Sequence, residues 1–223
     1  MRSERENTMV IISLRAATVP TLLPCLCLLI AGIVLAEEPA TNRPADWAEP
    51  RTVDGVPNLH EVTPNLYRSA QPTAEGMQEL DRLGIQTVVN LRSFHSDRDE
   101  IRDTELEYER MYMKAWHPER KEAIRFLQVV TDPGRQPVLV HCKHGADRTG
   151  ALFAIYRVAV QGWTKEEAIQ EMTEGGFGFH EVYRNLPKWI ERMDIEAVKK
   201  EAGLESGRES SVAEKIPVGV RWE

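Results

Sequence analysis

The segment that constrains the fold most is a short apolar run that leads through a glycine-containing loop into a helix. Residues 137–140 are wholly apolar, which is typical of a strand in the middle of a sheet that is covered on both faces. Residues 149–160 follow the loop and carry the apolar content of a packed helix. Because further strands and helices alternate along the chain, the sequence predicts an α/β layered domain.

The other expected elements follow from apolar periodicity and from turn residues. Val62 to Ala70 holds two short apolar stretches around a Pro64-Asn65 turn, and a helical pattern then opens at Pro72 and ends at Gly84. The remaining expected elements are strands at 85–91 and 108–113 and helices at 121–130, at 164–172 with a capping box, and from 181 to about 201.

Four regions are expected along the 223 residues. Residues 1–36 read as an export signal, because 16–36 carry no charge, arginines precede them and small residues precede Glu37. An uncleaved membrane anchor in the same orientation stays open, since the run is long enough to span a bilayer. Residues 37–57 hold four prolines and are expected to be a linker, 58–202 the globular domain, and 203–223 a flexible tail. The expected location is therefore periplasmic or otherwise extracytoplasmic.

The composition limits the possible functions. With 42% hydrophobic and 28% charged residues, the chain is neither disordered nor a polytopic membrane protein. The formal charge of −7 argues against nucleic acid as a partner, because phosphate-backbone binding usually requires a basic surface. Any recognition of phosphate must therefore be local.

A cysteine at the end of the apolar run indicates such a local phosphate site. Cys142 ends the expected strand, Gly145 allows a tight backbone curve, and Thr149 opens the helix. A loop wound in this way directs the N–H groups of residues 143–148 into one concavity at the positive end of the helix dipole. Arg148 can bind two oxygens of a phosphoryl group, and the same positive field favours the thiolate form of Cys142.

The segment from His141 to Gly150 resembles the signature loop of cysteine-dependent protein tyrosine and dual-specificity phosphatases: His-Cys, five residues, Arg, Ser/Thr-Gly. Residues 66–72 also resemble compact exported bacterial members, so the likeness spans roughly residues 58 to 200. It implies a central mixed, mainly parallel sheet flanked by helices. It also implies an enzyme that acts on phosphorylated proteins without a metal or other cofactor. The chain itself is expected to be a monomer.

The resemblance also assigns roles by position. Cys142 would be the nucleophile that forms a cysteinyl-phosphate, and Arg148 would clamp the phosphate and the transition state. Thr149 would assist the thiolate and the hydrolysis of the intermediate, and His141 would orient the loop. The expected substrate-binding residues are those of the loop: Lys143, His144, Gly145, Ala146, Asp147 and Arg148.

The chain departs from the family pattern at the general acid, which is usually an Asp in an upstream loop. The corresponding loop, residues 116–120, has no Asp, so Glu119 is the first candidate and His117 the second. Glu119 could instead simply begin the helix at Lys121.

Asp147 is a second departure, because an acid beside the bound phosphate opposes highly anionic substrates. It could instead point outward and tie the loop to a neighbouring Lys or Arg. Lys143 and His144 would add positive charge at the rim, or be solvated loop residues.

Three alternatives to a protein phosphatase stay open. The chain could be a phosphate-binding module with little turnover, in line with the missing Asp, or the same chemistry could act on inositol phosphates. His141, Cys142 and His144 could also hold zinc, if His180 or His117 supplied a further ligand.

Overall fold

The computed structural model describes residues 43–204, which form a six-stranded sheet with helices on both faces. The strands lie in the order β1-β2-β3-β6-β4-β5. Their bounds are Glu49–Pro50 (β1), His60–Thr63 (β2), Leu66–Ser69 (β3), Thr87–Arg92 (β4), Glu107–Met113 (β5) and Val138–His141 (β6). Strands β3, β6, β4 and β5 are parallel, whereas β1 and β2 join antiparallel at one edge. The expectation of a mixed, mainly parallel sheet is therefore confirmed.

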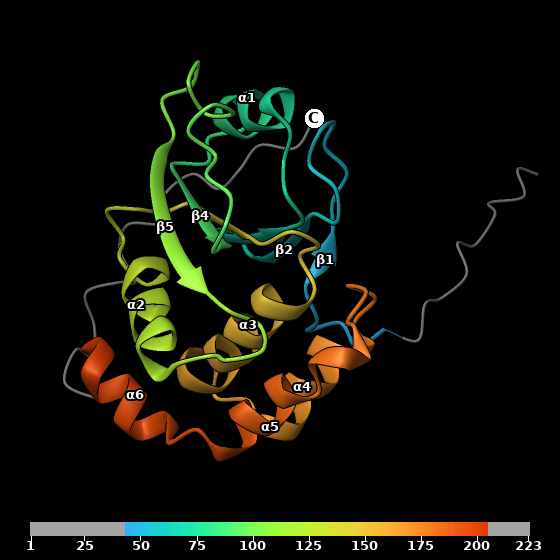
Figure 1. Ribbon diagram of the computed structural model, residues 1–223, viewed down its shortest axis with the longest axis vertical. Helices are drawn as coiled ribbons and strands as arrows, with labels where there is room; N and C mark the ends of the chain where they lie inside the picture. Colours follow the sequence, from blue (N-terminus) through green and yellow to red (C-terminus); the bar gives the residue numbers. More distant parts are fainter. Residues whose placement is uncertain (1–42, 205–223) are drawn as a thin grey trace, which may run out of the picture. The chain divides into compact units, whose positions relative to one another are not determined.

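The helices cover the two faces of this sheet unequally. Their bounds are Ala74–Arg82 (α1), Arg120–Val130 (α2), Asp147–Gln161 (α3), Lys165–Glu174 (α4), Glu181–Tyr183 (η1, a short 3-10 helix), Asn185–Arg192 (α5) and Ile195–Ala202 (α6). Helix α1 lies above the sheet in Figure 1, and α2 to α6 lie below it. Val88 and Leu139 pack with Met77 of α1, whereas Val89 and Val140 belong to the larger core on the other face. Strands buried on both faces explain why residues 137–140 carry no polar side chain.

The domain begins earlier than the sequence predicts. Residues 43–57 fall within the expected linker, yet they contribute strand β1, which pairs with β2. The side chains of Ala48 and Val56 are buried in the domain. A proline is tolerated in β1 because this strand lies at the edge of the sheet. The prolines therefore mark an irregular part of the fold rather than a linker.

The expected helix from 181 to about 201 is wrong as a single element, because the structure divides it into η1, α5 and α6. The break lies at Met193 and Asp194, where the Asp194 side chain accepts a hydrogen bond from the Ala197 N–H and begins α6. The capping box of Thr164 and Glu167 at the start of α4 is confirmed. Helix α3 begins at Asp147 rather than Thr149.

The predictions for residues 1–36, and for the tail from 205 onward, lie outside the described residues. Between residues 43 and 204, no helix is both long and apolar enough to cross a membrane.

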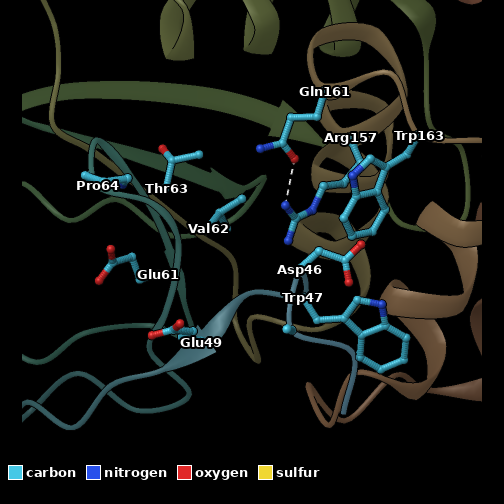
Figure 2. A pocket seen from close by; sticks show the side chains of 11 residues that line it. Asp46, Trp47, Glu49, Glu61, Val62, Thr63, Pro64, Arg157, Gln161 and Trp163 are labelled. Atoms are coloured by element: carbon cyan, nitrogen blue, oxygen red, sulfur yellow. Dashed lines mark hydrogen bonds between the residues drawn. The ribbon is translucent and has the colours of Figure 1, made fainter. Parts of the chain in front are cut away.

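A cavity of about 350 Å³ lies between the β1–β2 edge and the end of α3 (Figure 2). Trp47, Glu61 and Trp163 line it, together with Arg157, which donates a hydrogen bond to Gln161. No residue of the 141–149 loop is part of its lining. The loop around Cys142 is therefore a separate site.

Candidate active site

Cys142 lies at the carboxyl end of β6, the strand between β3 and β4 in the sheet. This end of a parallel sheet is where loops gather and where α/β proteins bind ligands. The thiol is free and almost fully buried, at 1% exposure. Five residues further on, Asp147 begins α3, so the loop between them lies at the N-terminus of a helix of fifteen residues. The positive end of that helix dipole favours an anion at Cys142.

The carbonyl groups of the loop are held from its outer side. Three donors from around β3 bind them: the Gln71 N–H binds the Lys143 oxygen (3.3 Å), Asn58 Nδ2 the His144 oxygen (2.8 Å), and Arg68 Nη2 the Gly145 oxygen (2.8 Å). In a trans peptide the C=O and the following N–H point in opposite directions. The N–H groups of residues 144–146 therefore face the inner side of the loop.

Gly145 is required at the centre of this loop for two reasons. Its φ of 71° lies in the left-handed region that disfavours residues with a side chain. A Cβ atom at this position would also lie 2.6 Å from the carbonyl carbon and oxygen of Ser69. The loop thus packs directly against the backbone at the end of β3, and a side chain would force the two apart.

Several donor groups of the loop and of the start of α3 have no partner among the described residues. Within residues 43–204, the N–H groups of residues 143–148 have no acceptor, and the Arg148 guanidinium makes no hydrogen bond or ion pair. The Thr149 hydroxyl is buried and is also without a hydrogen-bond partner there. Inward-facing N–H donors, a guanidinium and a hydroxyl, none of them bonded to another described group, are the groups that bind a tetrahedral oxyanion.

His141, directly before the nucleophile candidate, is held by the buried carboxylate of Asp97. Its Nε2 lies 2.7 Å from Oδ2 of Asp97, and both side chains are fully buried. Its Nδ1 lies 3.3 Å from the carbonyl oxygen of Cys142. Asn90 (2.9 Å) and Gln71 (3.0 Å) donate to the other carboxylate oxygen, Oδ1. The predicted role of His141 in orienting the loop thus has a structural basis in Asp97.

Asp97 and Arg68 are site residues that the sequence reasoning missed. Asp97 lies in the charged connection 93–103, and nothing in its local sequence distinguishes it from the other acids there. Arg68 could have been found from the sequence, because it is a charged residue inside the short apolar stretch 66–70. Its fully buried guanidinium lies 3.5 Å from the centroid of the Phe177 ring. Burial lowers the pKa of Arg68 to about 10, so it stays cationic at neutral pH.

Asp147 does not face the phosphate side of the loop. Its carboxylate accepts hydrogen bonds from the backbone N–H (2.9 Å) and ring Nδ1 (2.9 Å) of His180. The outward orientation that the sequence reasoning considered is therefore observed, with His180 as the partner in place of a Lys or Arg. Lys143 and His144 are exposed at the rim, and the His144 ring lies 5.0 Å from that of His180. The glycine-rich segment 175–180 thus borders the loop.

The two candidates for the general acid lie in the loop before α2. The Glu119 carboxylate is partly exposed and pairs with Lys121 at 2.7 Å. The hydrogen bond from Lys121 lowers the pKa of Glu119, whereas an acid that works near neutral pH needs a raised pKa. Its N–H donates to the carboxylate of Glu122, as at the start of a helix. His117 is exposed in the same loop. Both assignments stay predictions, and the contacts of Glu119 favour a capping role.

Comparison with known proteins decides the family. A family model described as "DSP-PTPase phosphatase fused to NAD+ Kinase" matches residues 51–184, which is more than half of the chain. The chain belongs to the dual-specificity type of protein tyrosine phosphatases. The predicted resemblance to this phosphatase family is therefore confirmed, and export stays a prediction.

Individual relatives agree with this family. The dual specificity protein phosphatase TpbA of Pseudomonas aeruginosa is 37% identical over 177 residues, which are 77% of this chain and 78% of TpbA. A crystal structure of TpbA in complex with pTyr has a TM-score of 0.64 and 33% identity, and the match covers 72% of this chain and 98% of that one. The inositol diphosphatase SIW14 of Saccharomyces cerevisiae is 24% identical over 152 residues, 64% of this chain and 53% of SIW14.

Proposed function

We propose that this phosphatase hydrolyses phosphate monoesters through a cysteinyl-phosphate intermediate. In the first step the Cys142 thiolate attacks phosphorus, the ester P–O bond breaks, and the leaving oxygen receives a proton from the general acid. In the second step water attacks phosphorus, the P–S bond breaks, and the same group, now a base, accepts a proton from the water. Arg148 and the N–H groups of the loop stabilise the charge on the equatorial oxygens.

The observation that carries this proposal is the outward anchoring of the loop carbonyls. Because the protein itself binds the oxygens of residues 143–145, the inner side of the loop presents only donors around Cys142. These donors are preorganised, so binding the transition state requires no rearrangement of the loop. The Thr149 hydroxyl, buried and without a partner among the described residues, supports its predicted role beside the thiolate.

We propose phosphotyrosine in proteins as the principal substrate. Support comes from TpbA, a dual specificity protein phosphatase whose structure was determined in complex with pTyr. The second candidate substrate class is inositol pyrophosphates, and it is supported by inositol diphosphatases among the relatives, SIW14 and the Arabidopsis thaliana protein DSP3. In the structure, the Asp147 carboxylate, which would oppose a highly anionic substrate, accepts hydrogen bonds from His180.

We further propose that the substrates are exported or envelope phosphoproteins. The uncharged stretch 16–36, with arginines before it, supports export or anchoring at the membrane. The check is a fractionation of cells that express the tagged chain. The proposal expects the chain in the periplasmic or membrane fraction, and recovery in the cytoplasmic fraction alone would contradict it.

Hydrolysis of para-nitrophenyl phosphate tests the chemistry. The purified full-length chain is compared with Cys142→Ser, which keeps the loop but replaces the thiolate by a poor nucleophile. We expect turnover that vanadate inhibits, that EDTA does not abolish and that Cys142→Ser eliminates. Equal turnover in the two proteins would overturn the proposal, and vanadate binding without turnover would support a phosphate-binding module instead.

The general acid is tested with paired substrates. Glu119→Gln and His117→Asn are assayed on an aryl phosphate, whose leaving group needs little protonation, and on an alkyl phosphate, whose leaving group needs more. The variant that removes the acid loses much more activity on the alkyl ester. A variant that loses equal activity on both esters, or none, does not carry the acid.

The substrate class is tested by competition. A phosphotyrosyl peptide and an inositol pyrophosphate are each titrated into the same assay, and kcat/KM is measured for both. The proposal expects the higher value for the peptide, and a higher value for the inositol pyrophosphate would reverse the order of the two candidates.

A further inference from the structure

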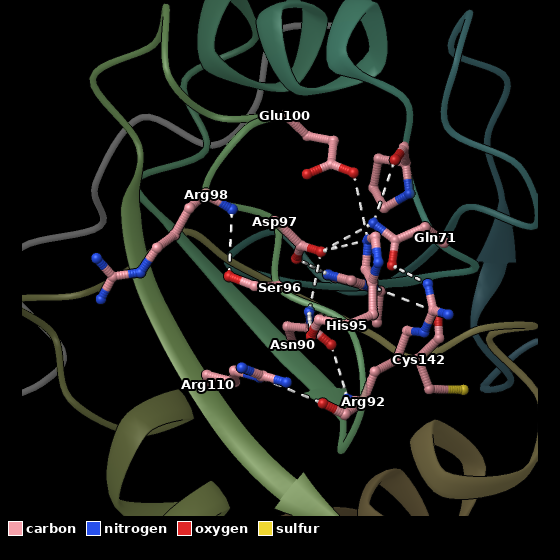
Figure 3. Close-up of polar contacts among 12 residues, drawn as sticks. Gln71, Asn90, Arg92, His95, Ser96, Asp97, Arg98, Glu100, Arg110 and Cys142 are labelled. Carbon is pink, nitrogen blue, oxygen red and sulfur yellow. Dashed lines mark hydrogen bonds and ion pairs between the residues drawn. The ribbon is translucent and has the colours of Figure 1, made fainter.

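We propose that His95, Asp97 and Glu100 form a binding site for one divalent transition-metal ion, with Zn²⁺ as the ion that fits the donors best. The three side chains come from one short segment between β4 and β5, and Figure 3 shows them converging above Asn90. One ligand atom from each lies within 4.8 Å of the others. One imidazole nitrogen and two carboxylate oxygens are ligands that Zn²⁺ accepts. The site is separate from the phosphate loop and does not depend on the proposed reaction.

The spacing of the ligand atoms fits a shared ion. His95 Nε2 lies 3.2 Å from Oε1 of Glu100 and 3.4 Å from Oδ1 of Asp97. Two ligands that bind Zn²⁺ tetrahedrally at their usual distances lie about 3.4 Å apart. These distances allow ion pairs when the imidazole is protonated, but the nitrogen makes no hydrogen bond to either carboxylate. The ligand atoms of the three side chains are thus spaced as they would be if they bound one ion.

The burial of these atoms points to a missing ligand. His95 Nε2 and Glu100 Oε2 are shielded from solvent and have no hydrogen-bond partner in the described part of the chain. A buried polar atom without a partner destabilises the native state by about 1–3 kcal/mol. A bound ion would satisfy the nitrogen and offset the two negative charges. The side chains of His95 and Glu100 are 30% and 25% exposed, so an ion can enter from solvent.

The neighbours of Asp97 hold its carboxylate in a fixed orientation at such a site. Asn90 and Gln71 donate to its Oδ1, and His141 binds its Oδ2, so the carboxylate cannot rotate freely. Metal ligands are commonly oriented by hydrogen bonds of this kind. Because Asp97 also holds His141 next to Cys142, an ion at this site would stabilise the segment that supports the phosphate loop.

A second cluster with metal-ligand side chains, His144, Asp147 and His180, fits less well. There the ring Nδ1 of His180 already bonds to the Asp147 carboxylate, whereas in the first cluster the buried ring nitrogen of His95 has no hydrogen-bond partner among the described residues. His144 and His180 are also exposed. The cluster serves as the internal comparison in the test below.

Zn²⁺ binding to the full-length chain is measured by isothermal titration calorimetry after removal of metals with EDTA and dialysis. Thermal unfolding with and without Zn²⁺ is the second readout. We expect one ion per chain and a higher unfolding temperature with Zn²⁺. His95→Gln and Glu100→Gln each remove a ligand and are expected to weaken binding by more than about 100-fold, because the loss of a hydrogen-bond partner of a ligand alone costs about 10- to 100-fold.

Two matched variants should leave this binding unchanged. Asp99→Asn removes an acid from the same segment whose side chain is 85% exposed and faces Arg102, and His180→Gln removes the other cluster. Circular dichroism of each metal-free variant confirms that it folds. The proposal is overturned if the wild-type chain shows no saturable binding, if His95→Gln and Glu100→Gln bind as the wild type does, or if His180→Gln abolishes binding. Since these readouts do not use turnover, they can succeed or fail independently of the proposed phosphatase chemistry.

Discussion

Replacing Gly145 by alanine tests whether the packing of the loop against β3 creates the phosphate site. The residue has a φ of 71°, and an added Cβ would lie 2.6 Å from the carbonyl group of Ser69 and 2.7 Å from the Ala70 nitrogen. All three neighbouring atoms belong to the backbone, so no side chain can rotate away to make room. The loop must therefore move away from β3, and the hydrogen bond from Arg68 to the Gly145 oxygen must lengthen.

Gly162→Ala provides a matched control. Gly162 follows α3 with a φ of 75°, but an added Cβ would meet no atom within 4 Å. The control therefore carries only the cost of the left-handed conformation, about 1–2 kcal/mol. Gly145→Ala adds steric strain of about 1–3 kcal/mol, so its free energy of unfolding should fall by about 2–5 kcal/mol in total.

Activity should distinguish Gly145→Ala from Gly162→Ala more clearly than stability does. A misplacement of about 1 Å at a catalytic site reduces the rate by about 100-fold. We expect Gly145→Ala to lose at least that factor in kcat/KM for para-nitrophenyl phosphate, and Gly162→Ala to keep its activity. Urea unfolding gives the stability of each variant. If the two variants lose equal stability and both stay active, the reasoning about the loop is refuted.

Three further predictions concern buried polar groups. Burial lowers the pKa of His60 from 6.5 to about 4, so between these pH values the unfolded chain binds more protons than the folded chain. The free energy of unfolding, fully present above pH 6.5, should therefore fall by about 2 kcal/mol between pH 7 and pH 5. Urea unfolding at each pH measures this fall, which should be smaller in His60→Gln. Asp97→Asn replaces the charged acceptor of His141 and should lower the free energy of unfolding by about 1.5–3 kcal/mol and kcat at least tenfold, whereas an unchanged kcat would show that the pair does not position the loop. Glu171→Gln breaks a buried ion pair with Arg157 and should destabilise the fold by about 3–5 kcal/mol, and a loss below 1 kcal/mol would contradict that pairing.

Local patterns in the sequence were sufficient for the central part of the fold. The apolar run before Cys142 predicted a buried strand, because a strand that is covered on both faces typically carries no polar side chain. Gly145 and the helix after the loop predicted the curve of the backbone, since both are properties of consecutive residues. The loop chemistry around Cys142 and Arg148 was accessible from sequence for the same reason.

Contacts between segments that are distant in the sequence could not be predicted from local patterns. Asp97 reaches His141 from 44 positions earlier in the chain, and its local sequence resembles any solvated charged connection. The edge strand β1 could not be predicted, because residues 43–57 hold three prolines and a strand of two residues leaves no periodicity. The break before α6 had a local signal that was overlooked, because Asp194 is a good residue to cap a new helix.

The central claim is that Cys142 carries the phosphoryl group during turnover. The most direct test is to quench the full-length chain with acid while it hydrolyses para-nitrophenyl phosphate, and to locate the modified residue by mass spectrometry. Thr149→Ala should increase the trapped fraction, because the Thr149 hydroxyl is expected to assist hydrolysis of the intermediate. We expect one phosphoryl group on Cys142 and none in Cys142→Ser. Turnover with an unmodified Cys142 at every quench time, or a phosphoryl group on another residue, would contradict it.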